Sequence, residues 1–370
     1  MWRLPSARPS RETEFLETAL ERVFSDPRVR TRADRALAAA AHAEPLIAQS
    51  LKTPQSLPYH GEGPFMEAHL RDMMAALYAV EDGTLDLCVV EEFARHKSFR
   101  GEVEELQDTL RERMAFFEAF IVCHDAAKWV SASCEGEPGS AGERLGFVVP
   151  PRAAWEDAGA ASRARVRSLY LDLYHAFAKD RPGELPADVQ AAFYGAYGIR
   201  VHFRGHDRMV HAPVYRALLS RVCARLRLTA DDERALEYLI AHHLQPLADF
   251  DGIWPERIGR YLVLANKAGL DGDDFIDLLQ AATFLDYVAG SAKRLTSASV
   301  PAHDPEPVIK FLESEHAFAP HRRAEAAKRR EDRKKQERNA VFREAGLDGL
   351  SLMDMLQMAP GPSFGALLAR

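Results

Sequence analysis

The segment "FIVCHDAAKW" places His124 and Asp125 side by side after an apolar run, with Lys128 three residues later. Adjacent residues on a helix project about 100° apart, so these two side chains cannot both face one dry core. Both can reach one divalent ion from the edge of a helix, because imidazole and carboxylate groups together suit transition metals. The segment therefore predicts part of a metal site, and the remaining ligands must come from elsewhere in the chain.

Other histidine and aspartate residues along the chain are candidates to complete this site. The sequence contains 14 histidines, and several lie in helical patterns beside small or acidic residues. Taken singly, such a histidine is more simply explained as a surface or hydrogen-bonded core residue, and Asp286 as a cap or an ion-pair partner. Taken together, they suit a divalent ion held rigidly in the core of a helix bundle. The candidate ligands are His69, His124, Asp125, His206, His242, His243 and Asp286.

The order of four candidates, His69, His124, Asp125 and Asp286, resembles the metal-binding signature of the HD superfamily of metal-dependent phosphohydrolases. The segment "HDAAK" is similar to that superfamily's His-Asp-x-Gly-Lys, with Ala127 at the usual glycine position. The segments "HGEGPFMEAHL" and "LMDMLQMAPGPSFGALLAR" are most similar to the HD region of bacterial tRNA nucleotidyltransferases, the CCA-adding enzymes. The resemblance implies an HD-domain helical bundle that binds metal.

The chain departs from the CCA-adding enzymes in two respects. No Gly-Gly/Ser motif with paired catalytic aspartates precedes the HD region, and the residues before His69 are too few for a nucleotidyltransferase head. The chain is therefore not expected to add nucleotides. The separation of Asp125 from His206 is longer than usual, which predicts an insertion at about 131–200 that shapes or covers the substrate entrance. The resemblance covers about residues 55–130, 200–290 and 347–370.

His206 in "GHD" and the pair His242-His243 resemble the extra ligands of superfamily members that bind two metals. The spacing after "GHD" is one residue off, so His211 is an alternative to His206, and His206 is the favoured choice. Two ions bridged by Asp125 would activate water and contact phosphate oxygens on both sides of an in-line displacement. One or two divalent ions are expected, and their identity among Mn, Ni, Co, Fe, Zn and Mg stays open.

Asp125 and Lys128 are the expected catalytic residues. Lys128 lies one turn beyond the ligands and could reach a non-bridging phosphate oxygen, where it would offset developing charge. The alternative is a plain surface lysine at a helix end. Arg204 and Arg208 flank His206 and are weaker candidates for phosphate contacts. Neighbouring acids such as Glu62 are expected to support the ligands or to face solvent.

The substrate expectation rests on the resemblance, because a fold does not choose a substrate. The HD region of CCA-adding enzymes implies 2′,3′-cyclic phosphodiesterase, 2′-nucleotidase or phosphatase activity at RNA ends. The first hypothesis is a metal-dependent phosphohydrolase acting on nucleotides or RNA 3′ ends. Its alternatives are a hydrolase of a free small nucleotide and a non-catalytic nucleic-acid-binding scaffold. Buried imidazoles and carboxylates without a metal would be costly, which argues against the scaffold.

Helical periodicity dominates the rest of the chain and predicts an all-α fold. Segments such as "SRETEFLETALERVF" and "EELQDTLRERMAFFEAFIVCHDAAKW" repeat apolar residues at three- and four-residue steps, and only "GIRVHF" suggests a strand. Gly, Pro and Ser between residues 131 and 155 predict a loop. The expected organisation is a helical segment 1–50, an HD domain 51–300, and a C-terminal extension 301–370 with a basic helix and a Pro-Gly-Pro tail.

Composition limits the classes of protein that the chain can belong to. With 370 residues, 47% hydrophobic residues and a net charge of −7, it can bury a core and shows no overall bias towards nucleic acid or membranes. The four cysteines are widely scattered, so disulfides are unexpected and a cytoplasmic location is the default. The first residues are too charged for a signal peptide, and no apolar run approaches membrane-spanning length.

A basic run near the C-terminus suggests a possible RNA contact. Residues 321–343 hold ten Lys or Arg against four acids, a local charge of +6 that leaves −13 for the remainder. Clustered cations suit sequence-independent binding to phosphate backbones. A solvated helix with ion pairs along its length explains the same residues equally well.

Overall fold

The computed structural model describes residues 23, 26–55, 60–94, 97–147, 159–248, 254–289 and 308–317. In the described part, 74% of the residues are helical and 5% lie in strands, so the predicted all-α class is confirmed. The chain divides into two compact units, Met1–Glu315 and His316–Arg370. Three predicted features lie outside the described residues: the helix "SRETEFLETALERVF" (apart from Val23), the basic helix at 321–343 and the Pro-Gly-Pro tail.

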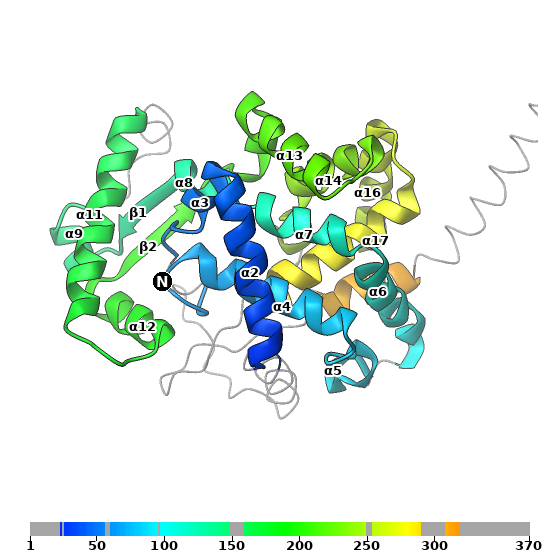
Figure 1. Cartoon of the computed structure of the whole chain (residues 1–370), viewed down its shortest axis with the longest axis horizontal. Helices are drawn as coiled ribbons and strands as arrows, with labels where there is room; N and C mark the ends of the chain where they lie inside the picture. Colours follow the sequence, from blue (N-terminus) through cyan, green and yellow to red (C-terminus); the bar gives the residue numbers. More distant parts are fainter. Residues whose placement is uncertain are drawn as a thin grey trace, which may run out of the picture. The chain divides into compact units, whose positions relative to one another are not determined.

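Four helices form the centre of the first unit (Figure 1). They are α4 (Met66–Glu81), α7 (Met114–Cys123), α14 (Ala230–His242) and α17 (Gly272–Thr283), which continues into the π-helical turn η4 (Phe284–Ala289). Helix α4 packs against α7 and η4, and α14 packs against α7 and α17. Nearly every residue of α4 is buried, because its sequence is apolar around most of the helix.

Further helices lie around this centre. The outer helices are α2 (Pro27–Ala43), α3 (Pro45–Ser50), α5 (Glu91–Ala94), α6 (Arg100–Glu112), α13 (Pro213–Arg225), α15 (Gln245–Ala248) and α16 (Trp254–Ala268), with 3₁₀ turns η1 (Leu87–Val89), η2 (Lys97–Phe99) and η3 (Asp207–His211). Residues 308–317 are also helical. In the described part of the chain, no helix is both long and apolar enough to cross a membrane, and all four cysteines are free thiols.

A buried carboxylate ties the N-terminal helices to the bundle. Glu44, only 3% exposed, joins α2 to α3 and accepts hydrogen bonds from Arg221 at 2.8 Å and from Arg225 at 3.0 Å, both on α13. The hydrogen bonds from Arg221 lower the pKa of Glu44, so the carboxylate is ionised at neutral pH. With this anchor at its end, α2 packs along α4.

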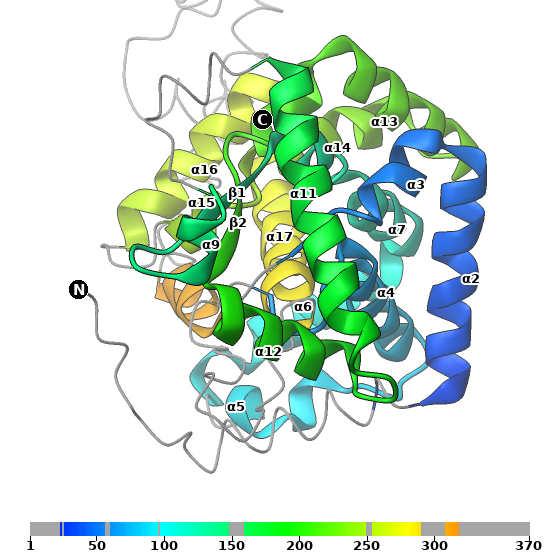
Figure 2. The same cartoon turned by 90° about the vertical axis from the view of Figure 1, so that its left-hand side faces the viewer.

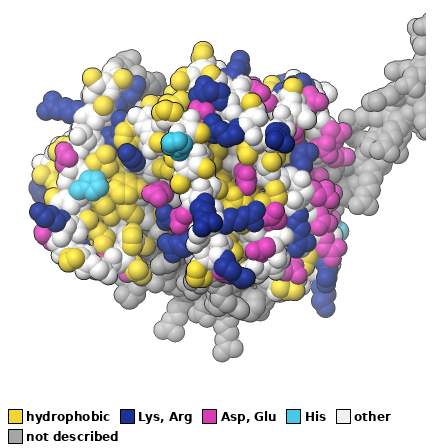
Figure 3. All heavy atoms as spheres, viewed as in Figure 1, with side chains coloured by type: hydrophobic (Ala, Val, Ile, Leu, Met, Phe, Trp, Pro, Cys, Tyr) yellow, Lys and Arg dark blue, Asp and Glu magenta, His cyan; other side chains and the backbone are white. Residues whose placement is uncertain are grey.

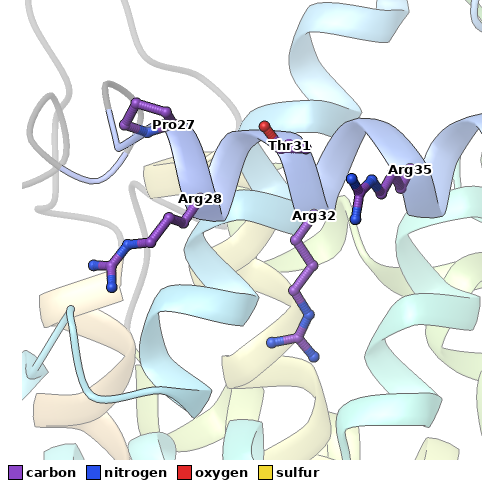
Figure 4. A pocket seen from close by; sticks show the side chains of 5 residues that line it. All are labelled: Pro27, Arg28, Thr31, Arg32 and Arg35. Atoms are coloured by element: carbon purple, nitrogen blue, oxygen red, sulfur yellow. The ribbon is translucent and has the colours of Figure 1, made fainter.

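The outward side of α2 carries arginines at one-turn spacing. Figure 4 shows Arg28, Arg32 and Arg35 along this side, where they line a shallow surface depression. Arg28 forms an ion pair with Asp26 at 3.1 Å, and Arg32 pairs with Glu81 on α4. The surface is therefore mixed in charge, and Figure 3 shows the same mixture of basic and acidic side chains over the face seen in Figure 1.

The prediction of one continuous helix through "HDAAK" is wrong. This part of the chain divides into α6, α7 and the short helix α8 (Lys128–Ser131). Arg113, with φ −112° and ψ 32°, interrupts the helix between α6 and α7. Residues 124–127 form turns between α7 and α8, which places the His-Asp pair where a helix ends rather than on its side.

The predicted insertion contains a two-stranded antiparallel sheet and its own helices. In chain order its elements are β1 (Ala132–Gly136), α9 (Ala141–Arg144), α11 (Ala160–Lys179), α12 (Pro186–Tyr197) and β2 (Ile199–Phe203). Ala132 pairs with Phe203 and Gly136 with Ile199, so β2 confirms the strand expected at "GIRVHF". The prediction of a loop at 131–155 is wrong for β1 and α9. Strand β1 pairs with β2, which lies far along the chain, so local composition does not reveal this strand.

The insertion has a small hydrophobic core. Helix α11 runs beside the two strands (Figure 2) and buries Tyr170 and Tyr174 against Phe193 of α12 and Val201 of β2. The ring centroids of Phe193 lie 5.5 Å from Tyr170 and 5.2 Å from Tyr174 in edge-to-face arrangements. This packing holds the sheet, and with it the chain that leaves β2, in a defined position.

We expect Gly142→Ala to destabilise the insertion. A Cβ at this position would lie against Cγ1 of Ile199 and 2.7 Å from the carbonyl oxygen of Tyr197, so the packing must shift. The expected loss is about 1–3 kcal/mol of unfolding free energy, measured by urea denaturation. Gly195→Ala in α12 is the matched control, because nothing lies within 4 Å of its new methyl group; it should be neutral or stabilising. Equal losses in both variants would contradict the close approach at Gly142.

Candidate metal centre

Six of the seven predicted ligands converge in one buried cluster. They come from five places in the fold: the first turn of α4, the turn after α7 (which supplies both His124 and Asp125), the turn after β2, the end of α14 and the π-helical turn η4. None exceeds 7% exposure. The six residues are His69, His124, Asp125, His206, His243 and Asp286. All of them except His206 belong to groups of three whose candidate ligand atoms lie within 4.8 Å of one another and could hold a metal ion.

Asp125 contacts ligands on both sides. Its Oδ2 lies 3.2 Å from Nε2 of His124 and 3.8 Å from Nε2 of His69. Its Oδ1 lies 3.1 Å from Nε2 of His206. The two oxygens of this carboxylate thus face different histidines: Oδ2 faces His124 and His69, and Oδ1 faces His206.

Asp286 faces the same imidazoles from η4. Its Oδ1 lies 3.1 Å from Nε2 of His69 and 3.8 Å from Nε2 of His124, and its Oδ2 lies 3.9 Å from Nε2 of His243. A π-helical turn holds an extra residue compared with an α-helical turn, and such turns are frequent at functional sites. The two aspartates therefore bracket the imidazole nitrogens.

Hydrogen bonds to the backbone orient three of the histidines. His124, His206 and His243 each donate from Nδ1 to the carbonyl oxygen three residues earlier, at 3.1, 2.8 and 2.6 Å. His124 and His243 are the residues that end α7 and α14, where the last carbonyl groups lack a partner within the helix. Because Nδ1 donates to the backbone, each ring turns Nε2 towards the cluster, and in its neutral form Nε2 carries the lone pair that a metal would bind.

Several inward-facing atoms lack a hydrogen-bond partner. Nε2 of His124, His206 and His243 and Oδ1 of Asp125 are buried without one, whereas Oδ2 of Asp125 is paired with Nζ of Lys128 at 2.7 Å. A buried polar atom left unpaired costs about 1–3 kcal/mol, so such a set needs an explanation. A shared cation would satisfy these atoms together.

The electrostatics of the cluster favour cation binding. Burial lowers the pKa of His69, but hydrogen bonds with Asp286 and Glu62 outweigh it and raise the pKa to about 10. For His124, burial is likewise outweighed by Asp125, and the pKa rises to about 9. Although burial opposes it, the histidines hold the pKa of both aspartates well below the usual range. The buried carboxylates thus draw positive charge, which a metal could supply in place of protons.

His69 is oriented by a side chain instead of the backbone. Oε1 of Glu62 accepts hydrogen bonds from Nδ1 of His69 at 3.1 Å and from Nδ1 of His60 at 3.0 Å. The side chain of Glu62 is 0% exposed. Burial would raise its pKa, but the two histidines lower it to about 2. Glu62 thus supports the candidate ligand His69 and does not face solvent; these were the two roles expected for it. His60 was missed by the sequence analysis, although it begins the same "HGEG" segment.

The structure distinguishes between the neighbouring histidines that the sequence left as alternative ligands. His211 is exposed and bonds through Nδ1 to Glu237 at 2.9 Å, whereas His206 lies in the cluster. His242 is half-buried and accepts a hydrogen bond from Gln245 at 2.8 Å, so this predicted ligand lies outside the cluster. His243, the next residue, is the one that faces Asp286.

Lys128 is buried beside the cluster. It is 5% exposed, and its Nζ lies 2.7 Å from Oδ2 of Asp125 and 4.9 Å from the ring centroid of Phe203. The alternative of a plain surface lysine is therefore wrong. Arg204 donates to Glu135 at 3.1 Å, and Arg208 is exposed on η3.

Two pairs of neighbouring histidines test the ligand set. We expect His206→Ala and His243→Ala to lower the Mn²⁺ content of protein dialysed against the metal, because each removes an inward-facing nitrogen. His211→Ala and His242→Ala are the matched controls and should keep the wild-type content. Elemental analysis by mass spectrometry measures it. A loss in the controls as large as in the cluster variants would reject the assignment.

A second prediction concerns Glu62. We expect Glu62→Gln to weaken Mn²⁺ binding by roughly 10–100-fold, since carboxylates that orient a ligating histidine contribute about this much to affinity. Isothermal titration calorimetry measures the dissociation constant. Glu67→Gln is the control, because Glu67 lies on the exposed side of α4, where it pairs with Arg71. An unchanged affinity in Glu62→Gln would show that its contact with His69 does not matter for binding.

Comparison with known proteins identifies no relative. No protein-family model matches the chain, and no curated protein or solved structure shows significant similarity to it.

Proposed function

We propose that this protein is a metal-dependent phosphohydrolase of the HD type that acts on nucleotide or RNA-terminal phosphates. The observation that carries the proposal is the buried convergence of His69, His124, Asp125 and Asp286 from separate parts of the chain. This is the residue order in which the sequence resembles the HD superfamily. The proposal therefore rests on a likeness in sequence and on a geometry that supports it independently.

The donor set suits one or two divalent ions. His69, His124, Asp125 and Asp286 would hold the first, and His206 and His243 would join Asp125 at the second. Asp125 supports a bridging role because its two oxygens face different histidines. Four imidazoles with two carboxylates favour Mn, Fe, Co, Ni or Zn over Mg, which prefers oxygen ligands and retains its waters.

The chain's own residues would bind and orient the phosphate. A bound divalent ion would supply Lewis-acid stabilisation of phosphate charge and water of lowered pKa. Lys128, held 2.7 Å from Asp125, would offset the charge that develops on a phosphoryl oxygen. The ring of Phe203 and the burial of the cluster exclude solvent around this lysine, which strengthens its electrostatic effect. Arg204 and Arg208 stay candidates for contacts with more distant parts of the substrate.

The substrate class follows from the resemblance to the HD region of CCA-adding enzymes. That likeness favours RNA ends with 2′,3′-cyclic or terminal phosphates. The basic segment 321–343 would suit an RNA backbone by its charge. The non-catalytic scaffold is disfavoured, because it gives no reason for burying Oδ1 of Asp125 and three histidine nitrogens without hydrogen-bond partners.

The proposal is tested by phosphate release or ring opening on an RNA that ends in a 2′,3′-cyclic phosphate. We expect turnover that requires Mn²⁺, Co²⁺ or Ni²⁺ and is abolished in Asp125→Asn. Lys128→Met should lower kcat by roughly 10²-fold, about the effect of removing one group that stabilises transition-state charge. Arg216→Met is the control, because Arg216 is exposed and pairs with Glu237 away from the cluster.

The outcomes separate the candidate functions. Metal binding without turnover on RNA, but with turnover on a free nucleotide, would replace the RNA substrate with a small one. Removing residues 321–343 should weaken action on RNA and leave action on a small nucleotide unchanged. A protein that binds RNA equally well after Asp125→Asn, and that carries no metal, would leave the scaffold ahead.

A further inference from the structure

The loop that precedes α4 supplies the group that orients His69. Its base is closed by backbone hydrogen bonds from Gln55 N to Pro64 O at 2.8 Å and from Met66 N to Thr53 O at 2.9 Å. Between these bonds the loop carries His60 and Glu62. Any displacement of this loop therefore moves Glu62 relative to Nδ1 of His69.

One side chain of the insertion binds this loop from outside. Nε2 of Gln190, on α12, donates to the carbonyl oxygens of Gln55 and His60, each at 3.1 Å. Gln190 is 2% exposed, and its Oε1 is buried without a hydrogen-bond partner. Tyr170 of α11 adds a weaker bond from its hydroxyl to the same carbonyl of Gln55, at 3.4 Å. A single amide thus spans the two sides of the loop just before Glu62.

We propose that Gln190 is a positioning residue for the metal ligand His69, acting through the loop and Glu62. The inference rests on the proposed metal centre and assigns a role to the insertion within it. Gln190 sets the carbonyl of His60, the ring of His60 shares Oε1 of Glu62, and Glu62 orients His69.

Among the candidate ligands, we expect His69 to depend on Gln190, because a loop supplies a hydrogen-bond partner of its ring. The other three histidines of the cluster bond to carbonyls of their own helix or turn, so they are fixed locally. His69 bonds to a side chain that a loop provides, and the insertion holds that loop. Ligand geometry tolerates displacements of only about 0.5 Å, so a loosened loop is expected to weaken binding.

A double-mutant cycle tests the proposal. Mn²⁺ dissociation constants would be measured by calorimetry for the full chain, Gln190→Met, Glu62→Gln and the double variant. Methionine keeps the size of glutamine and removes the donor. We expect Gln190→Met to weaken binding by roughly tenfold, the lower end of the range for residues that orient a ligand. The double variant should bind no more weakly than Glu62→Gln alone, because both act through one contact.

Additive effects would overturn the proposal, since Gln190 would then act independently of Glu62. Gly195→Ala, on the same helix α12, is the matched control, because nothing lies within 4 Å of its new methyl group. It should leave Mn²⁺ affinity unchanged. Equal weakening in this control would also overturn the proposal. Should Gln190→Met fail to fold, Tyr170→Phe takes its place and should shift affinity in the same direction by a smaller factor.

A readout on metal-free protein separates this inference from the proposed function. The Nδ1 proton of His69, hydrogen-bonded to Glu62, should give a resolved resonance in ¹⁵N-histidine NMR spectra, and Gln190→Met should weaken or remove it. If wild-type protein binds no Mn²⁺, the proposed function fails, while this resonance still decides the role of Gln190. A resonance unchanged in Gln190→Met would overturn the inference even if the wild-type protein binds metal.

Discussion

The burial of two carboxylates, Asp125 and Asp286, is the constraint on which the rest of the structure depends. Charged groups taken out of water need a compensating charge within a few ångströms. Imidazole nitrogens surround both carboxylates, and Lys128 stands beside Asp125. Because these groups come from α4, α8 and η4 and from the turns or ends that follow α7, β2 and α14, the compensation requires that all six elements meet. The central helices are thus arranged around a cluster of charge as much as around an apolar core.

Most residues of this cluster are positioned at the ends of helices or strands. His124 and His243 stand where helices stop, and their rings satisfy carbonyl groups that helix ends leave unpaired. The same hydrogen bonds decide which ring nitrogen faces inward. His69, in the first turn of α4, is oriented in another way. Its orientation is supplied by Glu62 from a loop, at the cost of depending on whatever holds that loop.

The sequence indicated the helical class and most of the cluster, for physical reasons that are visible in it. Helical periodicity is a local property, and the pairing of histidine with aspartate in "HDAAK" signals chemistry that few core positions require. The sequence could not decide between His242 and His243. Which of these two adjacent side chains faces the cluster depends on where the helix ends. Strand β1 was equally hidden, since its partner β2 follows only after the helices α9, α11 and α12. His60 bonds to Glu62, and this contact depends on a loop conformation that no periodicity encodes.

The insertion is better regarded as part of the candidate metal centre than as an appendage. It begins directly after α8, which carries Lys128, and it ends at β2, three residues before His206. The carbonyl of Phe203, the last residue of β2, accepts the hydrogen bond that orients His206. Arg167 of α11 also donates to the carbonyl of Trp129 in α8, so the insertion grips the helix that bears the lysine. Because β1 follows α8 directly, β2 ends at the carbonyl that orients His206, and Arg167 contacts α8, a rigid insertion limits how far Lys128 and His206 can move apart. The hydrophobic core of the insertion therefore contributes to the geometry of the site, although none of its side chains is a ligand.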